Sequence, residues 1–289
     1  MSEPGVVVVT GATGRQGGAV TRALLQDGRR VRAMTRKPEG AAARVLAAAG
    51  ADVVPADMDD PASLDRAFSG ADAVYSVQNF MTSGLDGEVR QGRNVSEAAA
   101  RAGVRHLVYG SAGVGRRGTG VGSWESKLDV EDHLRALGLP VTVLRPMAFM
   151  ELMTDRAFYP AAGVWHVWPK MAGWDFRVPW LSCHDLGVIA AKAFADPEGY
   201  SGRDLQLAAE FRSLEECRAT YARVMGRGPR RFPMPHWLFQ RFTPDTVRMW
   251  EWCRENDLDT DPELTRSIHP EAMTVETWLR SRKTAPRPV

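Results

Sequence analysis

The sequence has few cysteines and none of the features that direct a chain to a membrane. Only three cysteines, Cys183, Cys217 and Cys253, occur in 289 residues, and their odd number and wide spacing argue against a disulfide framework or a metal site. The first residues lack a basic segment, and the apolar run at residues 6–9 is far shorter than a signal sequence or membrane span. We therefore expect an unprocessed cytoplasmic protein with no membrane association and no metal.

The sequence also lacks an excess of charge of either sign. Lysine and arginine number 37 against 35 acidic residues, a formal net charge of +2, so no strong electrostatic attraction to nucleic acid is expected. The hydrophobic content of 44% is ordinary for a globular protein. A chain of this length can form one large α/β domain, or a nucleotide-binding domain with a smaller companion.

The first half of the chain alternates short apolar runs with longer amphipathic segments, which is typical of a doubly wound parallel sheet, the Rossmann type of α/β fold. A glycine follows each predicted helix, where a left-handed residue commonly ends it. The predicted strands are residues 6–10, 30–35, 52–56, 73–77, 106–109 and 141–144. The predicted helices are residues 14–27, 41–49, 61–68, 88–102 and 124–137, followed by Gly28, Gly50, Gly70, Gly103 and Gly138.

The regular alternation ends after Pro146. Residues 165–174 are rich in tryptophan and turn residues, and they form either a loop over a pocket or packing in the protein core. Predicted helices at residues 213–225, 236–256 and 274–282 make the remainder mainly helical. We expect a Rossmann domain at residues 1–155, to which residues 176–197 return, and a smaller substrate-side lobe at residues 156–175 and 198–289.

A glycine-rich turn joins the first strand to the first helix. It holds Gly11, Thr13, Gly14, Arg15, Gln16 and Gly17, with the three glycines spaced as GxxGxxG. Glycine lets the backbone turn sharply and approach a pyrophosphate closely, and the N–H groups at the helix start face that anion. Because strand, turn and helix occur in the required order, the turn predicts a dinucleotide site.

The residue after the second strand contacts the adenosine ribose. An acidic residue there favours NAD, and a basic residue accommodates the 2′-phosphate of NADP. Arg36 and Lys37 occupy this place and no acid does. The sequence therefore favours NADP(H) as the cofactor.

Further polar residues follow the third and fourth strands, at the edge where ligands bind in open α/β sheets. Asp57 and Met58 follow the third strand, and Gln78 and Asn79 follow the fourth. Asp57 is suited either to the adenine amino group or to capping the next helix.

These motifs, together with Gln91-Gly92, the segment from Arg145 to Glu151 and the closing Thr274-x-x-x-Trp278-Leu279 pattern, resemble the NmrA-like family of atypical short-chain dehydrogenases. The resemblance runs nearly end to end. It implies a Rossmann domain with a small helical lobe and NADP(H) in the cleft, and it adds Pro146 and Phe149 to the expected cofactor contacts. The family contains redox-sensing regulators as well as quinone, imine and ether reductases.

Ordinary short-chain dehydrogenases use a serine and a YxxxK pair, in which tyrosine gives the proton and lysine holds the nicotinamide ribose. Ser111 and Lys127 stand at the matching positions, but Ser123 replaces the tyrosine. Lys127 is predicted in the first turn of its helix, where the macrodipole disfavours a cation, and either ribose hydroxyls or the neighbours Glu125 and Asp129 would compensate. The glycine-rich residues 110–120 form either a lid or an unconstrained surface loop.

Two functions follow from these residues. The first is an NADPH-dependent reductase of a small apolar carbonyl, quinone or imine-type substrate, with Lys127 and Ser111 as its catalytic residues. The second is a non-catalytic NADPH/NADP redox sensor that regulates a protein partner, which the missing tyrosine favours. The sequence leans toward the reductase, because no partner-binding signal competes with the cofactor site, and it allows a monomer or a homodimer.

Overall fold

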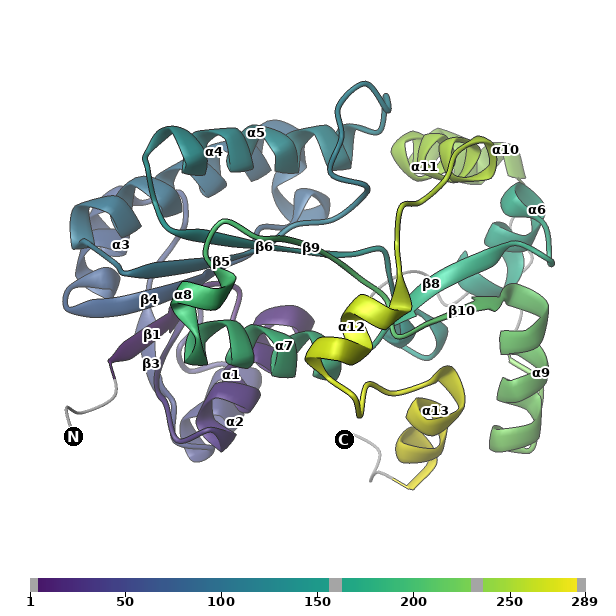
Figure 1. Ribbon diagram of the computed structural model, residues 1–289, viewed down its shortest axis with the longest axis horizontal. Helices are drawn as coiled ribbons and strands as arrows, with labels where there is room; N and C mark the ends of the chain where they lie inside the picture. Colours follow the sequence, from purple (N-terminus) through teal and green to yellow (C-terminus); the bar gives the residue numbers. More distant parts are fainter. Residues whose placement is uncertain (1–4, 156–162, 230–235, 285–289) are drawn as a thin grey trace. The chain divides into compact units, whose positions relative to one another are not determined.

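The computed structural model describes residues 5–155, 163–229 and 236–284, and the chain divides into two compact units (Figure 1). The first unit comprises Met1–Gly118, Gly122–Arg145 and Leu186–Leu205. The second comprises Thr119–Val121, Pro146–Asp185 and Gln206–Val289. Residues 156–162, part of the predicted smaller lobe, lie outside the described residues.

A seven-stranded sheet forms the centre of the first unit, which confirms the predicted Rossmann-type α/β fold. Its strands are β1 (Val6–Val9), β2 (Arg30–Thr35), β3 (Asp52–Pro55), β4 (Ala71–Ser76), β5 (His106–Gly110), β6 (Val141–Pro146) and β9 (Asp204–Leu207). They lie in the order β3-β2-β1-β4-β5-β6-β9, and the pairings of β1 with β2 and β4 are parallel. The order reverses at β1 and β4, so the carboxyl ends of these two strands border the crevice where such sheets bind ligands.

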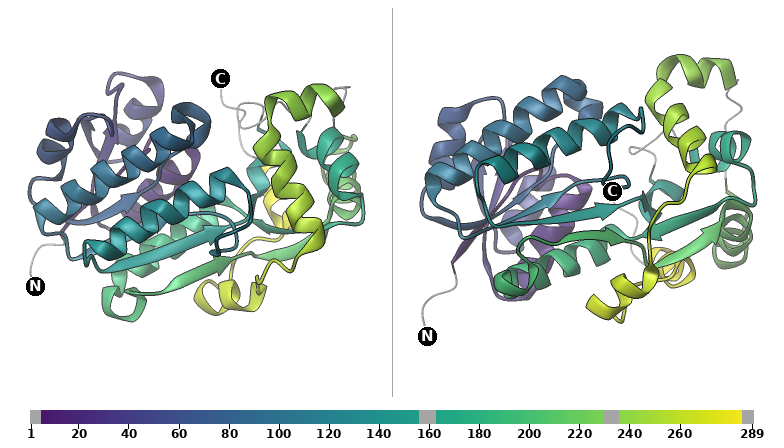
Figure 2. Two further views of the ribbon diagram at one scale, coloured as in Figure 1. Left: turned by 90° about the horizontal axis from the view of Figure 1, so that it is seen from above. Right: turned by 45° about the horizontal axis from the view of Figure 1, so that its top comes forward.

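Helices cover both faces of this sheet (Figures 1 and 2). On one face lie α1 (Arg15–Gln26), α2 (Ala41–Ala48) and α7 (Cys183–Ala195), and on the other α3 (Pro61–Phe68), α4 (Phe80–Ala102) and α5 (Gly122–Ala136). The sheet is buried between them, as the fully unexposed side chains of Val8, Val74 and Leu107 show. This two-sided burial explains why the strands read as continuous apolar runs.

Helix α4 begins eight residues earlier than the sequence predicts. The Asn79 side chain accepts a hydrogen bond from the Met81 N–H and caps the helix. Gly84, at φ 74°, then interrupts the helical backbone. Because this interruption breaks the apolar periodicity, the segment before Glu88 carries no clear helical pattern.

The second unit contains a separate three-stranded sheet. Its strands are β10 (Glu210–Ser213), β8 (Arg177–Leu181) and β7 (Ala148–Phe149), with β8 antiparallel to β10 and parallel to β7. The strand predicted at residues 176–180 therefore pairs outside the Rossmann sheet, whereas the chain from Leu186 lies in the first unit. The sequence did not predict β10, since a strand of only four residues, mostly polar, gives little signal.

The remaining elements are mostly short helices. They are the 3-10 helix Met150–Met153, the π-helix Gly163–Val167, α6 (Trp168–Ala172), α8 (Pro197–Tyr200), α9 (Leu214–Met225), α10 (His236–Phe242), α11 (Pro244–Glu255), α12 (Pro262–Ile268) and α13 (Val275–Thr284). The single helix predicted at residues 236–256 is divided, because the residue before Pro244 is disfavoured in helical conformation. No helix among the described residues is long and apolar enough to cross a bilayer.

The tryptophan-rich stretch forms helices and packs inside the second unit, which decides between the two interpretations of its sequence. Trp165 and Trp168 are both only 3% exposed. The Trp165 indole N–H donates to the Met153 carbonyl, and the Trp168 ring lies 5.9 Å from that of Trp180 and 4.3 Å from that of Trp250. These tryptophans are core residues.

His106 on β5 makes the stability of the protein depend on pH. The ring is 1% exposed and its Nε2 lies 2.8 Å from the Thr142 Oγ1, and burial lowers the pKa of His106 from 6.5 to about 4. The unfolded chain takes up this proton near pH 6.5 and the folded chain does not, so stability is lost as the pH falls from 6.5 toward 4. We expect the free energy of unfolding in urea to fall by up to about 3 kcal/mol across this range.

The variant His106→Gln, which has no proton to gain, serves as the comparison. Its unfolding free energy should change less between pH 7 and pH 4.5 than that of the native chain. Equal losses in the two proteins would show that other groups cause the acid sensitivity.

Candidate functional site

The glycine-rich turn brings the end of β1 into direct backbone contact with the start of α1. Gly11 has φ 57°, and its carbonyl accepts a hydrogen bond of 2.8 Å from the Gly14 N–H. A Cβ atom on Gly17 would lie 2.4 Å from the Gly11 carbonyl oxygen. This distance is far too short for any side chain, so the turn and the helix can meet only if residue 17 is glycine.

The amino end of α1 lacks an internal partner for its positive dipole. Gly14 occupies the capping position without a side-chain hydrogen bond, and the first turn contains no acidic residue. Thr13 and Gly14 are exposed. A helix start of this kind, with amide groups not satisfied by a cap, is suited to an anion.

The chain after β4 lies beside this turn. The Thr10 hydroxyl donates to the Val77 carbonyl at 3.2 Å and accepts from the Val77 N–H at 2.9 Å. Gln78 follows, 4% exposed, with its Nε2 donating to the Ser76 Oγ at 3.0 Å. Its Oε1 is buried and has no hydrogen-bond partner among the described residues. A buried acceptor without a donor is costly, and a ligand hydroxyl or amide would satisfy it.

Arg36 and Lys37 lie exposed just after β2. In the part of the chain that the structure describes, no ion pair holds either side chain. The pKa of Asp59 is lowered chiefly by a hydrogen bond from Gln91, against the opposing effect of burial, and the charges of Arg90 and Arg36 contribute. Both cations therefore remain available to an anionic ligand at this edge of the sheet.

The loop after β3 shows which acid caps the following helix. The Asp60 Oδ1 accepts a hydrogen bond from the Ala62 N–H and caps α3, so the capping role considered for Asp57 is filled. Asp57 is half-buried, and its Oδ1 accepts from the Asp59 N–H at 3.0 Å. The Sδ of Met58 lies 3.8 Å from the Gln78 Nε2, so the loops after β3 and β4 meet.

Helix α4 holds the loop after β3 in place and packs tightly against α5. The Gln91 Nε2 donates to the Asp59 Oδ2 at 2.7 Å, and the Asn94 Nδ2 donates to the Met58 carbonyl at 2.9 Å. A Cβ on Gly92 would lie 2.4 Å from the Val130 Cγ2. Gln91 and Gly92 thus have separate roles, one in positioning the loop and one in helix packing.

Lys127 is paired with Glu88, a carboxylate that the sequence does not predict as its partner. Its Nζ donates to the Glu88 Oε1 at 3.0 Å and to the Gln78 carbonyl at 3.4 Å, and the side chains of Lys127 and Glu88 are 9% and 0% exposed. Because α5 begins at Gly122, Lys127 lies in the second turn, and the predicted conflict with the helix dipole does not arise.

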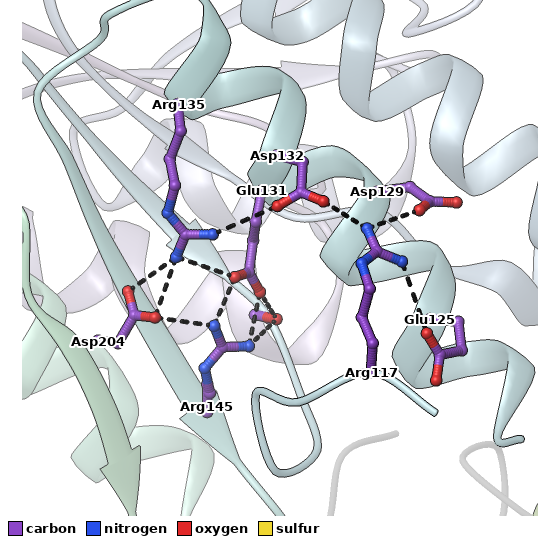
Figure 3. A network of polar contacts seen from close by, with 9 residues as sticks. Arg117, Glu125, Asp129, Glu131, Asp132, Arg135, Arg145 and Asp204 are labelled. Atoms are coloured by element: carbon purple, nitrogen blue, oxygen red, sulfur yellow. Dashed lines mark hydrogen bonds and ion pairs between the residues drawn. The ribbon is translucent and has the colours of Figure 1, made fainter. Parts of the chain in front are cut away.

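Glu125 and Asp129, the neighbours considered as partners of Lys127, contact Arg117 instead (Figure 3). The Arg117 guanidinium also reaches Asp132. Arg117 belongs to the glycine-rich segment, which is therefore held on α5 and is not an unconstrained loop. A Cβ on Gly115 would lie 2.8 Å from the Arg145 Nε, so the segment also approaches Arg145 closely.

Ser111 belongs to a buried polar network on the same unit. Its hydroxyl donates to the Glu131 Oε1 at 2.6 Å and accepts from the Arg145 Nη1 at 3.2 Å. Arg145 also contacts Asp204 at 3.1 Å, and Arg135 reaches Glu131 and Asp204 (Figure 3). The one proton of Ser111 is thus donated to a buried carboxylate.

Tyr109 on β5 is fully buried. Burial, with the charges of Glu88 and Glu131, raises the pKa of Tyr109 well above 10. A phenol in this state is a weak proton donor.

Comparison with known proteins places this architecture in a family. The NmrA-like family model matches residues 3–278. The chain belongs to the NmrA-like family. It is 32% identical over 304 residues to the NmrA-like family domain-containing oxidoreductase FrzB of Cladobotryum sp, covering 91% of this chain and 90% of FrzB.

Solved structures share the fold at lower identity. NmrA, a negative transcriptional regulator, solved in complex with NADP, aligns with a TM-score of 0.73 at 21% identity, over 96% of this chain and 95% of its own. The triphenylmethane reductase of Citrobacter sp., complexed with NADP(H), aligns with a TM-score of 0.75 at 18% identity, over 96% of this chain and 99% of its own.

Three further positions bear on the site: Ser123, which replaces the expected tyrosine, and the predicted cofactor residues Pro146 and Phe149. Ser123, at the tyrosine position of ordinary short-chain dehydrogenases, is 7% exposed on α5. Pro146 and Phe149 are buried residues of the second unit, and their cofactor contacts stay predictions. The other predicted cofactor residues all lie in the first unit, at the carboxyl ends of β1 to β4 or, for Lys127, on α5.

Proposed function

We propose that this NmrA-like protein binds NADP(H) and uses it to reduce a small apolar carbonyl, quinone or imine-type substrate. In this proposal the pyrophosphate lies at the turn from Gly11 to Gly17, and Arg36 and Lys37 face the adenosine 2′-phosphate. Gln78 and Lys127 lie toward the nicotinamide ribose. When bound, the cofactor supplies the hydride.

Three observations on the first unit support the proposed binding of NADP(H). The Gly17 position has room only for a hydrogen atom, as the close packing of helix on strand in a dinucleotide-binding turn requires. The buried Oε1 of Gln78 needs a donor. Arg36 and Lys37 supply positive charge without an acid at the end of β2, which suits a phosphate better than a ribose hydroxyl.

The placement of Lys127 is the observation that carries the proposal of turnover. This buried ammonium group is held by Glu88 and by the Gln78 carbonyl at the end of β4, and in the proposal it orients the ribose for hydride transfer. The similarity to FrzB, named as an oxidoreductase, supports the same conclusion.

The proton is not expected to come from a protein hydroxyl. Ser111 donates to Glu131, and Tyr109 is buried with a raised pKa. A serine at position 123 is a poor acid near neutral pH. We infer that water or the substrate itself supplies the proton, so that orientation by Lys127 is the larger contribution of the protein.

The test is NADPH oxidation, followed by absorbance, across a panel of quinones, enals and imines. With a substrate from this panel, Lys127→Met should lower kcat/KM by about 100-fold, the cost of a misplaced reactant. The matched control is Lys192→Met, an exposed lysine on α7, which should leave the rate unchanged. Background oxidation by the native protein with every compound would reject the reductase proposal.

The absence of the tyrosine favours a second candidate, a redox sensor that binds NADPH without consuming it. Such a sensor must bind its protein partner differently when occupied and when empty. A partner captured equally with and without NADPH would reject this candidate.

A further inference from the structure

Glu88 is a fully buried carboxylate with two partners, both on α5. Its Oε1 accepts from the Lys127 Nζ at 3.0 Å and its Oε2 accepts from the Ser126 hydroxyl at 2.5 Å. Both oxygens are thus held, on a side chain that is 0% exposed. The contacts fix the carboxylate between two helices and leave it little freedom to move.

Stability alone does not explain this ion pair. Removing two charges from water costs several kcal/mol for each ion, and well-packed apolar residues of similar volume often serve the fold as well or better. Elsewhere α4 and α5 meet through small and apolar groups, as at Gly92 and Val130, and through the more exposed pair Glu97–His133. A buried charge in such an interface points to a use for the charge.

The hydrogen bonds of Lys127 indicate what that use is. An ammonium group has three N–H donors, and the described residues occupy two of them, at Glu88 and at the Gln78 carbonyl. The orphaned acceptor Oε1 of Gln78 belongs to the same residue as that carbonyl. One donor and one acceptor therefore remain for a ligand group next to the end of β4.

We propose that Glu88 is the positioning residue for Lys127, which it holds oriented so that the remaining N–H meets a hydroxyl of the nicotinamide ribose. This inference rests on the proposed binding of NADP(H). Glu88 does not itself touch the cofactor. It acts through Lys127, with Ser126 holding its second oxygen.

The test compares two ligands that differ in the nicotinamide half. Glu88→Gln keeps the shape of the side chain and removes its charge. Its dissociation constant for NADPH should rise about tenfold, the effect of weakening about one hydrogen bond to a charged group. Its dissociation constant for adenosine 2′,5′-bisphosphate, which lacks the nicotinamide ribose, should change less than about twofold. The control Glu97→Gln, an exposed acid on the same helix, should change neither.

A double-variant cycle with Lys127→Met shows whether Glu88 acts through the lysine. If it does, the pair Glu88→Gln with Lys127→Met should bind NADPH no more weakly than Lys127→Met alone. The proposal would be overturned if the increases in the NADPH dissociation constant caused by the two substitutions multiplied in the double variant. It would also be overturned if Glu88→Gln weakened the binding of both ligands equally. A Glu88→Gln variant that binds NADPH as the native chain does would likewise overturn it.

The experiment also distinguishes failure of the proposed cofactor site from failure of the Glu88→Gln variant to fold. A native chain that binds neither ligand rejects the proposed cofactor, and with it this inference. If Glu88→Gln does not fold, Ser126→Ala asks the same question, because it loosens only the second oxygen of Glu88. Ser126→Ala should weaken NADPH binding two- to fivefold with no change for the bisphosphate, and unchanged NADPH binding would overturn the inference.

Discussion

Replacing Gly17 with alanine is expected to abolish measurable NADP(H) binding. The added Cβ would lie 2.4 Å from the Gly11 carbonyl oxygen and 2.7 Å from the Thr10 carbonyl oxygen. Both atoms belong to the backbone, so neither can swing aside. The turn and α1 must separate, which moves the amide groups proposed to hold the pyrophosphate. We expect affinity to fall at least about 100-fold, comparable to the loss of two good charge-assisted hydrogen bonds.

Two other glycines give matched comparisons. A Cβ on Gly228 would meet no atom within 4 Å among the described residues beyond its chain neighbours, so Gly228→Ala should leave binding unchanged. Gly18→Ala places the Cβ 3.1 Å from the Ala12 carbonyl oxygen. Its affinity for NADPH should lie between those of Gly17→Ala and Gly228→Ala. Calorimetric titration with NADPH measures all three, and a Gly17→Ala protein that binds as tightly as the native chain would contradict the placement of the pyrophosphate.

The second large effect is on stability, at Arg145. This residue is 2% exposed and contacts Glu131, Asp204 and Ser111. Burial would lower the pKa of Arg145, but the hydrogen bond and charge of Glu131, with Asp204, raise it above its ordinary value. Arg145→Met leaves Glu131 buried without its main counter-charge, and we expect a loss of about 3–5 kcal/mol in unfolding free energy.

Thermal and urea unfolding measure this loss, and two variants test its cause. Arg105→Met removes an exposed ion pair with Asp72 and should cost less than about 1 kcal/mol. The pair Arg145→Met with Glu131→Leu removes both main charges and should recover much of the stability. If Arg145→Met costs no more than Arg105→Met, the network does not stabilise the fold.

The glycine turn, the strands β1 to β6 and most of the helices between them could be predicted because their signals are local. Strand, turn and helix from Val6 to Gln26 form one continuous stretch, and most strands from β1 to β6 are short, mainly apolar runs bounded by turn residues. The unpredicted β9 instead alternates polar and apolar residues. The five glycines that end helices all have positive φ, as their positions predicted. The backbone conformation at these places depends on residues that are neighbours in the sequence.

The partners of the site residues could not be predicted in the same way. Glu88 lies 39 positions from Lys127, and an acid on an amphipathic helix is usually exposed. Arg145 similarly meets Glu131 and Asp204 only because β6, α5 and β9 come together. Side-chain pairing across elements depends on packing, and the spacing within any one element does not report it.

The most direct test of the proposed cofactor site is the affinity of the native chain for NADPH and for NADH, measured by calorimetric titration at the same ionic strength. We expect NADPH to bind at least about tenfold more tightly, because Arg36 and Lys37 meet the 2′-phosphate, and we expect this preference to be lost in Arg36→Ala with Lys37→Ala. Equal affinity for the two cofactors, or no binding of either, would contradict the proposed site.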